Sequence, residues 1–413
     1  MTSEPGARPS RVSGLTLILL ATAASGIAAY VVTWLVPRQV GFASYTAFAV
    51  FWSFCYLIVG ALSGIQQEVS RGTRPVAVPD GDGRRARRFG LVAAGAVFVA
   101  VVATAPLWVG AVFPDQGWNL VLPLAVGVSG YVLVAVLCGS LYGISAWPPL
   151  AMLMFADAVL RLAAVGITLT LTSDVVALAW AVAVPFPGAI ALLWPVTRRY
   201  LARRTTLDVG YSRLVRNVAQ TVVAAAASAI MVSGFPLVLG LASRGEPPEV
   251  VGLYILAITL TRAPLIVVVL SLQSYLVVTF RDAAGGAPVL RILGALALAG
   301  AVLAAAGWWL GPPVFSFLFP GEPVPTSGLI AVLVFSSALV ASLSVTGPAL
   351  LARSRHLVYG AGWLVAAVVT IAVLFLPIDF EVRTVAALLL GPVAGLVVHG
   401  AAVASARRTV GRD

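Results

Sequence analysis

Residues 148–171 read PPLAMLMFADAVLRLAAVGITLTL, an apolar stretch that nevertheless contains Asp157 and Arg161. About 20 apolar residues make a transmembrane helix, because the hydrocarbon core of a bilayer is about 30 Å thick. A charge at the bilayer centre costs roughly 2.5 to 3.5 kcal/mol on insertion scales, so such residues usually face the protein interior or a cavity. The stretch therefore predicts a membrane-spanning helix with a polar face.

The whole chain has the composition of this stretch. Hydrophobic residues make up 60% of it, charged residues 10%, and the mean hydropathy is +1.02. These values lie far outside the range of soluble globular proteins, and they predict an all-α polytopic membrane protein. Twelve spans are expected, at 13–36, 43–65, 89–112, 119–142, 148–171, 175–196, 218–242, 250–279, 289–311, 326–351, 357–377 and 383–405. The first is too long for a signal peptide and is expected to be retained.

Arginine placement predicts the orientation of the spans. All 26 basic residues are arginine, and only Arg38, Arg244 and Arg383 fall in outer loops if the N-terminus starts inside. The positive-inside rule then gives a multi-pass protein of the cytoplasmic membrane with both termini cytoplasmic. The net charge is +11, and the arginines that give rise to it border apolar spans instead of forming a continuous soluble basic face. Anionic inner-leaflet lipids are therefore the expected partners, and no nucleic acid is expected.

Short matches repeat at an offset of about half the chain. Residues 25–27 are echoed by 233–235 and residues 94–97 by 299–302, and the spans that contain the second pair run out to Phe113-Pro114 and Phe319-Pro320. Their collinearity predicts a duplicated six-helix unit, with lobes at 1–196 and 218–413 and a basic linker at 197–217. In transporters built from parallel repeats of this kind, the substrate binds between the lobes near the membrane midplane, and one lobe rocks against the other.

Four features together give the chain a family resemblance. They are the six-plus-six layout, the exit of the second span at 64–71, the Phe-Pro exits, and the small-residue turns at 139–143 and 347–351. In these the chain resembles the multidrug/oligosaccharidyl-lipid/polysaccharide (MOP) flippase superfamily, in its polysaccharide (O-antigen type) exporter branch. The resemblance covers nearly the whole chain, which lacks the two extra C-terminal spans of the lipid II flippase branch.

The resemblance implies a fold and a substrate. The fold is MATE-like, with two six-helix lobes. The substrate is an undecaprenyl-diphosphate-linked oligosaccharide or polysaccharide precursor, moved across the membrane with cavity cations holding its diphosphate. A monomer is expected, and an envelope glycan polymerase or glycosyltransferases are candidate partners.

Three charged residues inside the spans are the candidate site. Asp157 and Arg161 are one helical turn apart and can pair, either as a structural ion pair or with Arg161 binding a phosphate and Asp157 coupling to an ion. Arg262 has no acidic residue within a turn and lies two positions before Pro264. It is either a cavity cation for an anionic head group or a partner of Asp157 or of a freed carbonyl. Arginine suits a diphosphate because its planar donors bind oxygen pairs.

Weaker candidates surround these charges. Gln273 is expected to line the cavity and to bond sugar hydroxyls, and Trp52, one turn from Tyr56, either stacks on sugar or packs against a neighbour. A hinge is predicted at Gly234, Pro236 and Pro264, because glycine and proline interrupt helices. Gln66, Gln67 and Glu68 end the second span and are interpreted as a solvated helix end.

Three other functions are weighed against transport of an anionic lipid. An enzyme is not expected, because the outer loops are short and hold no carboxylate pair for acid–base chemistry. A multidrug or other small-molecule antiporter of the same fold would use an acidic cavity, whereas the middle parts of the predicted spans hold two arginines and one aspartate. A non-transporting membrane scaffold would be indifferent to the cavity charges. No cofactor or metal is predicted, since Cys55 and Cys138 share no ligand spacing.

Overall fold

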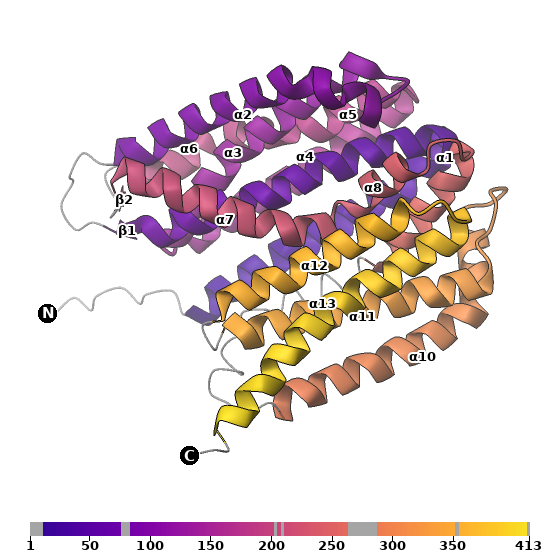
Figure 1. Cartoon of the computed structure of the whole chain (residues 1–413). Coiled ribbons are helices and arrows are strands. Elements are labelled where there is room, and N and C mark those ends of the chain that lie inside the picture. Colours follow the sequence, from indigo (N-terminus) through magenta and orange to yellow (C-terminus); the bar gives the residue numbers. More distant parts are fainter. Residues whose placement is uncertain are drawn as a thin grey trace, which may run out of the picture. The chain divides into compact units, whose positions relative to one another are not determined.

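The computed structural model of the chain describes residues 11–75, 83–201, 205–207, 210–262, 287–351 and 355–410. These residues are almost entirely helical (Figure 1), and ten helical stretches among them are long and apolar enough to cross a membrane. One stretch covers the first two predicted spans, and the predicted span 250–279 runs beyond the described residues after Arg262. The prediction of an all-α polytopic protein is confirmed.

The helices follow the predicted spans in order. They are α1 Arg11–Gly72, α2 Gly83–Val112, α3 Val121–Gly143, α4 Trp147–Leu171, α5 Val175–Ala183, α6 Pro185–Leu201, α7 Tyr211–Val232, α8 Phe235–Ala242, the helical residues 248–262, α10 Ala287–Leu318, α11 Ser327–Leu351, α12 His356–Leu374 and α13 Phe380–Val410. A short 3-10 helix, Gly117–Leu120, precedes α3, and two strands, β1 Thr73–Pro75 and β2 Thr205–Leu207, complete the described elements.

α1 has 62 residues and cannot cross the membrane as one straight rod. A straight helix of that length would measure about 93 Å, three times the hydrocarbon thickness. The helical conformation is interrupted at Gly41, where φ is 73° and ψ is 165°. A positive φ of this size favours glycine, which has no Cβ. Gly41 thus separates the two predicted spans that α1 contains.

The chain divides into two compact units. Unit 1 comprises Met1–Val32, Leu62–Val109 and Asp115–Val223, and unit 2 comprises Thr33–Ala61, Gly110–Pro114 and Ala224–Asp413. α1 and α7 therefore contribute residues to both units. The lobes 1–196 and 218–413 are defined by sequence repeats instead of contacts, and they stay a prediction.

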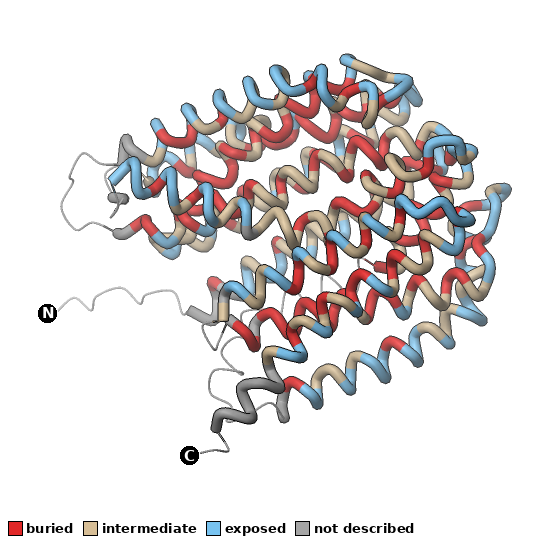
Figure 2. The backbone as a smooth tube through the Cα atoms, viewed as in Figure 1, coloured by how far each residue is buried: buried red, intermediate tan, exposed pale blue. Residues whose placement is uncertain are grey.

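α3 forms the centre of unit 1. Its residues Leu124, Val128 and Val132 are completely buried, and the helix packs against α4, α5 and α6. A Cβ at Gly130 would lie 2.8 Å from the Cδ of Pro187, so glycine is what lets α6 approach. Small residues at such contacts are typical of membrane helices, because close packing drives their association. Figure 2 shows buried positions along these helices.

A two-stranded ribbon closes one end of unit 1. β1 follows α1 directly and pairs antiparallel with β2, so that Thr73 lies opposite Leu207. β2 belongs to the predicted linker 197–217, and the ribbon therefore ties this linker to the loop that follows α1 (Figure 1). The ribbon was not predicted, because strands of three residues show no readable alternation of polar and apolar residues.

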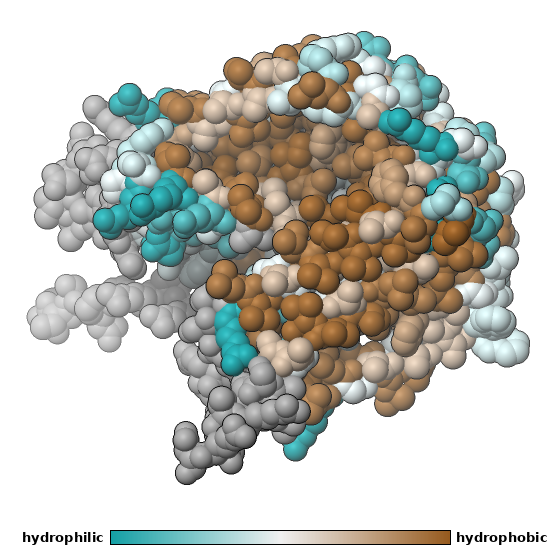
Figure 3. Space-filling view, viewed as in Figure 1, coloured by the Kyte–Doolittle hydropathy of each residue, from teal (hydrophilic) through white to brown (hydrophobic). Residues whose placement is uncertain are grey.

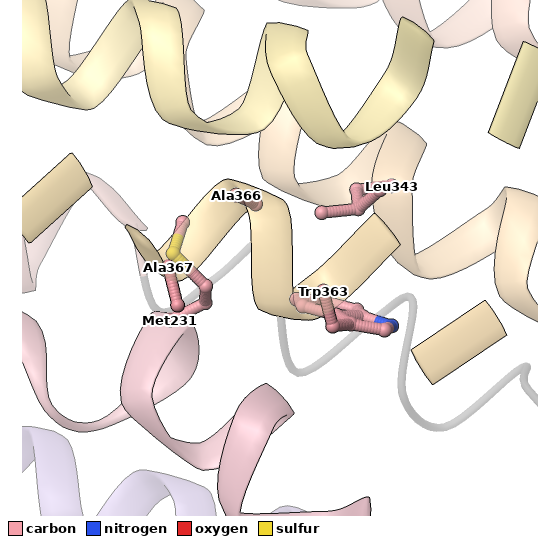
Figure 4. Close-up of a cluster of buried hydrophobic side chains, with 5 residues drawn as sticks. All are labelled: Met231, Leu343, Trp363, Ala366 and Ala367. Carbon is pink, nitrogen blue, oxygen red and sulfur yellow. The ribbon is translucent and has the colours of Figure 1, made fainter. Parts of the chain in front are cut away.

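In unit 2 a buried cluster joins three helices (Figure 4). Met231 comes from α7, Leu343 from α11, and Trp363, Ala366 and Ala367 come from α12. The two alanines leave space into which the flexible Met231 side chain fits. The cluster therefore holds the end of α7 against the C-terminal helices.

α12 and α13 pack without room for additional side-chain atoms. A Cβ at Gly362 would collide with the ring of His399, and one at Gly391 would collide with the hydroxyl of Thr370. His399 is completely buried, with its Nδ1 2.7 Å from the Thr346 hydroxyl. Its other nitrogen lies 3.2 Å from the Tyr359 carbonyl, so both ring nitrogens have a partner in the protein.

Large apolar side chains are exposed along the helices. Leu107, Trp309, Phe317 and Leu357 are 77% to 91% exposed, and Figure 3 shows hydrophobic residues over most of the face in view, with hydrophilic residues toward its edges. Exposure on this scale is unfavourable in water but is expected where the surface meets lipid. The chain is therefore a multi-pass membrane protein.

α1 and α7 are in close contact at Gly64, in unit 1. A Cβ there would lie 2.6 Å from the backbone nitrogen of Val222 and 2.7 Å from the backbone carbon of Thr221. The Thr221 hydroxyl donates a hydrogen bond of 3.1 Å to the Gly64 carbonyl. Because the obstructing atoms are backbone, they cannot move aside as a flexible side chain would.

We expect Gly64→Ala to destabilise the protein, although alanine normally favours a helix over glycine by about 1 kcal/mol. Overpacking should lower the free energy of unfolding by about 1 to 3 kcal/mol. Gly95→Ala is the matched control, because no atom lies within 4 Å of a Cβ at that helical position. Thermal unfolding in detergent measures both variants, and equal midpoints would contradict the close approach of α1 and α7.

Candidate substrate site

Arg262 is a buried charge whose side chain has no hydrogen-bond partner among the described residues. It closes the helical residues 248–262 and is only 4% exposed. None of its three side-chain nitrogens has a hydrogen-bond partner among the described residues. Its guanidinium carbon lies 5.5 Å from the ring centroid of Phe235, the first residue of α8.

This environment is costly for a cation. A guanidinium carries five N–H donors and no acceptor, and a buried charge without hydrogen bonds is strongly destabilising. The aromatic ring of Phe235 offsets a part of this cost, of the order of 1 to 2 kcal/mol. The N–H donors of the planar Arg262 guanidinium have the geometry to bind an anion with paired oxygens, such as a phosphate.

The predicted interruption of the seventh span is present beside Phe235. α7 ends at Val232 and α8 begins at Phe235. The hydroxyl of Ser53, on α1, donates to the Ser233 carbonyl at 2.5 Å and accepts from the Leu237 amide at 3.1 Å. A single buried side chain therefore satisfies backbone groups on both sides of the interruption.

The hinge role of these residues stays a prediction. Gly234 caps α8, and a Cβ there would lie 2.8 Å from the Ile230 carbonyl oxygen. Pro236 occupies the first turn of α8, where a missing N–H costs little. Pro264 lies outside the described residues.

Asp157 and Arg161 meet as their spacing predicts. The Arg161 Nη2 lies 2.6 Å from both carboxylate oxygens of Asp157, and the two side chains are 6% and 24% exposed respectively. The Arg161 guanidinium also stacks 4.3 Å from the ring centroid of Phe186, on α6. These contacts hold the pair inside unit 1, and whether it has a second role in transport stays a prediction.

Trp52 lies in a row of aromatic side chains along α1. It stacks on Tyr56, with ring centroids 4.8 Å apart, and lies 5.8 Å from Phe48, which in turn lies 6.4 Å from Tyr45. Trp52 and Tyr56 remain partly exposed, whereas Tyr45 and Phe48 are buried. The spacing 45, 48, 52, 56 can be read from the sequence and places all four aromatic residues on one face of a helix. The sequence-based prediction covers only the pair Trp52 and Tyr56. Gln273 lies outside the described residues.

The interpretation of Glu68 as part of a solvated helix end is wrong. Glu68 is 4% exposed, and its carboxylate accepts a hydrogen bond of 2.8 Å from the amide of Asn217, on α7. Arg71 also binds this carboxylate, through Nε at 2.9 Å and through Nη2. Asn217 is 149 residues away in the sequence, so nothing local revealed that a partner covers the helix end.

A surface groove of about 660 Å³ is present in unit 2. Apolar residues of α11 and α13 line most of it, including Leu329, Val332 and Leu389, and its charged residues are Asp379 and Glu381. The two carboxylates would repel an anion, so we do not assign the groove to an anionic head group.

Solved structures define the class of fold. An inward-facing multidrug resistance MATE family transporter of the MOP superfamily superposes with a TM-score of 0.65 and 15% identity, over 97% of this chain and 98% of that one. An outward-facing structure gives 0.64 and 13% over the same shares. A MOP superfamily transporter from Pyrococcus furiosus, with "reverse polarity of binding pocket", gives 0.62 and 13% over 96% and 97%. The chain has the MATE transporter fold, as predicted.

Sequence relatives define the family, although no protein-family model matches the chain. The uncharacterized protein Rv3630 of Mycobacterium tuberculosis is 35% identical over 395 residues, which cover 93% of this chain and 90% of the relative. Mb3654 of Mycobacterium bovis has the same identity and coverage. Rv1510 of M. tuberculosis is 34% identical over 394 residues, with the same two shares. The chain belongs to the family of these mycobacterial proteins.

We expect Asp157→Ala to lower the free energy of unfolding by about 3 to 5 kcal/mol, because it leaves the Arg161 charge buried without its carboxylate. The double variant Asp157→Leu/Arg161→Met should recover most of this loss, since apolar residues of similar size often replace a buried pair without cost. Thermal unfolding of the purified variants in detergent provides the comparison. A double variant no more stable than Asp157→Ala would refute a purely structural pair.

Proposed function

We propose that the protein is a flippase that moves a lipid-linked oligosaccharide or polysaccharide precursor, of the undecaprenyl-diphosphate type, across the cytoplasmic membrane by alternating access. The MATE transporter fold supports transport as the general activity, because it is found in both inward-facing and outward-facing structures. The substrate class rests on the chemistry of the candidate site.

Arg262 is the observation that carries this proposal. Its guanidinium is buried at the interruption between α7 and α8, and it has no hydrogen-bond partner among the described residues. A diphosphate supplies both the negative charge and the paired oxygens that a planar fork of donors binds. The free energy that a buried cation without hydrogen bonds to the described residues costs the folded protein would then be regained when the substrate binds.

The balance of charge favours an anion over a cationic drug. Cationic substrates are expected to need an acidic cavity, whereas the one carboxylate of the three candidate charges, Asp157, already binds Arg161. The Pyrococcus furiosus transporter, with its reversed pocket polarity, supports the idea that this fold accommodates substrates of different charge.

The other predicted residues take secondary roles in this proposal. Arg161 is a second phosphate ligand. Asp157 is the ion-coupling residue, which alternates between pairing with Arg161 and protonation. Trp52 and Gln273 contact sugar. Both termini are cytoplasmic, and the protein works as a monomer that receives its substrate from glycosyltransferases or delivers it to a glycan polymerase.

The proposal predicts that Arg262→Ala abolishes most export without loss of protein. In a strain that lacks the native gene, inward-facing lipid-linked sugar should accumulate, and export should fall about 10- to 100-fold, the effect of losing a charged hydrogen-bonding partner. Arg262→Lys, which keeps the charge but not the planar fork, should restore export only in part.

Arg291→Ala is the matched control, because Arg291 is an exposed arginine of the same unit. It should leave export unchanged. Normal export by Arg262→Ala, at a normal protein level, would rule out the diphosphate site. A loss of multidrug resistance in place of glycan export would favour the antiporter of the same fold.

A further inference from the structure

The packing of α1 against α7 sets a register at one end of unit 1. The Gly64 carbonyl accepts from Thr221, and one turn further along α1 the Glu68 carboxylate accepts from Asn217. Residue numbers therefore rise along α1 while they fall along α7, as in an antiparallel pair. The next turn brings Arg71 on α1 to the level of Arg213 on α7.

Glu68 lies at this end of the contact between α1 and α7, which we call the α1–α7 seam. Its carboxylate is buried and is shared between Asn217 across the seam and Arg71 on its own helix. A bidentate contact with a buried carboxylate limits the freedom of the Arg71 side chain, which nevertheless remains 60% exposed. Glu68 therefore both joins the two helices and holds Arg71 at their end.

The start of α7 is also fixed. Leu214 is completely buried, and Tyr211 packs edge-to-face against Phe89, with ring centroids 6.1 Å apart. Arg213 and Arg216 are exposed in this first turn and a half of α7. Together with Arg71 and Glu68 they carry a formal charge of +2, and among the described residues Glu68 is the carboxylate that binds one of these guanidinium groups, that of Arg71.

We infer that Arg71, Arg213 and Arg216 form a binding site for a phosphate group at the predicted cytoplasmic end of the α1–α7 seam. Guanidinium groups bind phosphate oxygens in pairs, and because the two helices that supply them are already packed, binding requires no rearrangement of their backbone. A phosphate here bridges a helix of the first repeat and a helix of the second. This site is separate from Arg262, and its existence does not depend on the proposed transport activity.

Two sources supply this chemistry, and they can be told apart. One is the head group of an anionic phospholipid of the inner leaflet, whose surface attracts arginine. The other is a soluble phosphate compound. The test measures the midpoint of thermal unfolding of the whole chain in three kinds of nanodisc sample. They are phosphatidylcholine alone, phosphatidylcholine with added phosphatidylglycerol, and phosphatidylcholine with inorganic pyrophosphate in solution.

Binding should raise the midpoint of thermal unfolding, because a ligand that binds only the folded state stabilises it. Arg213→Gln/Arg216→Gln should remove most of this shift and weaken binding about tenfold or more. The matched control is Arg198→Gln/Arg199→Gln, which removes the same charge from exposed positions at the end of α6 in the same unit. All substituted side chains are exposed, so both variants should fold.

The outcomes decide the inference. A shift with phosphatidylglycerol that only the α7 variant loses supports a lipid site, and the same selectivity with pyrophosphate supports a soluble ligand. Equal loss in both double variants would mean that diffuse surface charge attracts the anion, and it would overturn the site. The absence of any shift in the unmodified protein would also overturn it.

Discussion

The interior of a bilayer offers no water to replace a missing hydrogen bond or to solvate a charge, and this constraint organises the protein. Backbone groups freed at a helix break must be satisfied by other parts of the chain. The hydroxyl of Ser53 does so between α7 and α8 by donating to Ser233 and accepting from Leu237. Asp157 does the same for the charge of Arg161. An interruption and a buried cation are thereby tolerated within apolar helices.

Arg161 and Arg262 show that the partner, and not the residue type, decides what a buried arginine does. They are 5% and 4% exposed, and each stacks on a phenylalanine ring. Arg161 additionally holds a carboxylate through one of its nitrogens. Arg262 has no hydrogen-bond partner among the described residues. A protein retains such an unsatisfied charge at a cost in stability, which selection tolerates most readily where a ligand completes the site.

The sequence allowed the spans, the fold class and the Asp157–Arg161 contact to be predicted, because each depends on local features. Hydropathy over about 20 residues identifies a span, and a spacing of four residues places two side chains on one helical face. The glycine and proline at 234 and 236 likewise marked the end of α7. The expected repeat helped to suggest the fold, since collinear matches at half the chain length are visible without coordinates.

The features that were missed depend on contacts between distant segments. Glu68 was misjudged because its partner Asn217 comes from another helix, and a carboxylate at a helix end is normally solvated. The β1–β2 ribbon was missed because two strands of three residues are stabilised only by meeting each other. The groups that join segments far apart in the sequence are therefore the ones that local patterns describe least well.

The ribbon also bears on how the predicted linker 197–217 is held. α6 continues to Leu201, β2 occupies Thr205–Leu207, and α7 begins at Tyr211, so regular structure takes up much of the predicted linker. Pairing with β1 then fastens the middle of the connection to the segment that leaves α1. Within unit 1, the predicted linker is therefore the place where the end of α1 is joined to the chain between α6 and α7.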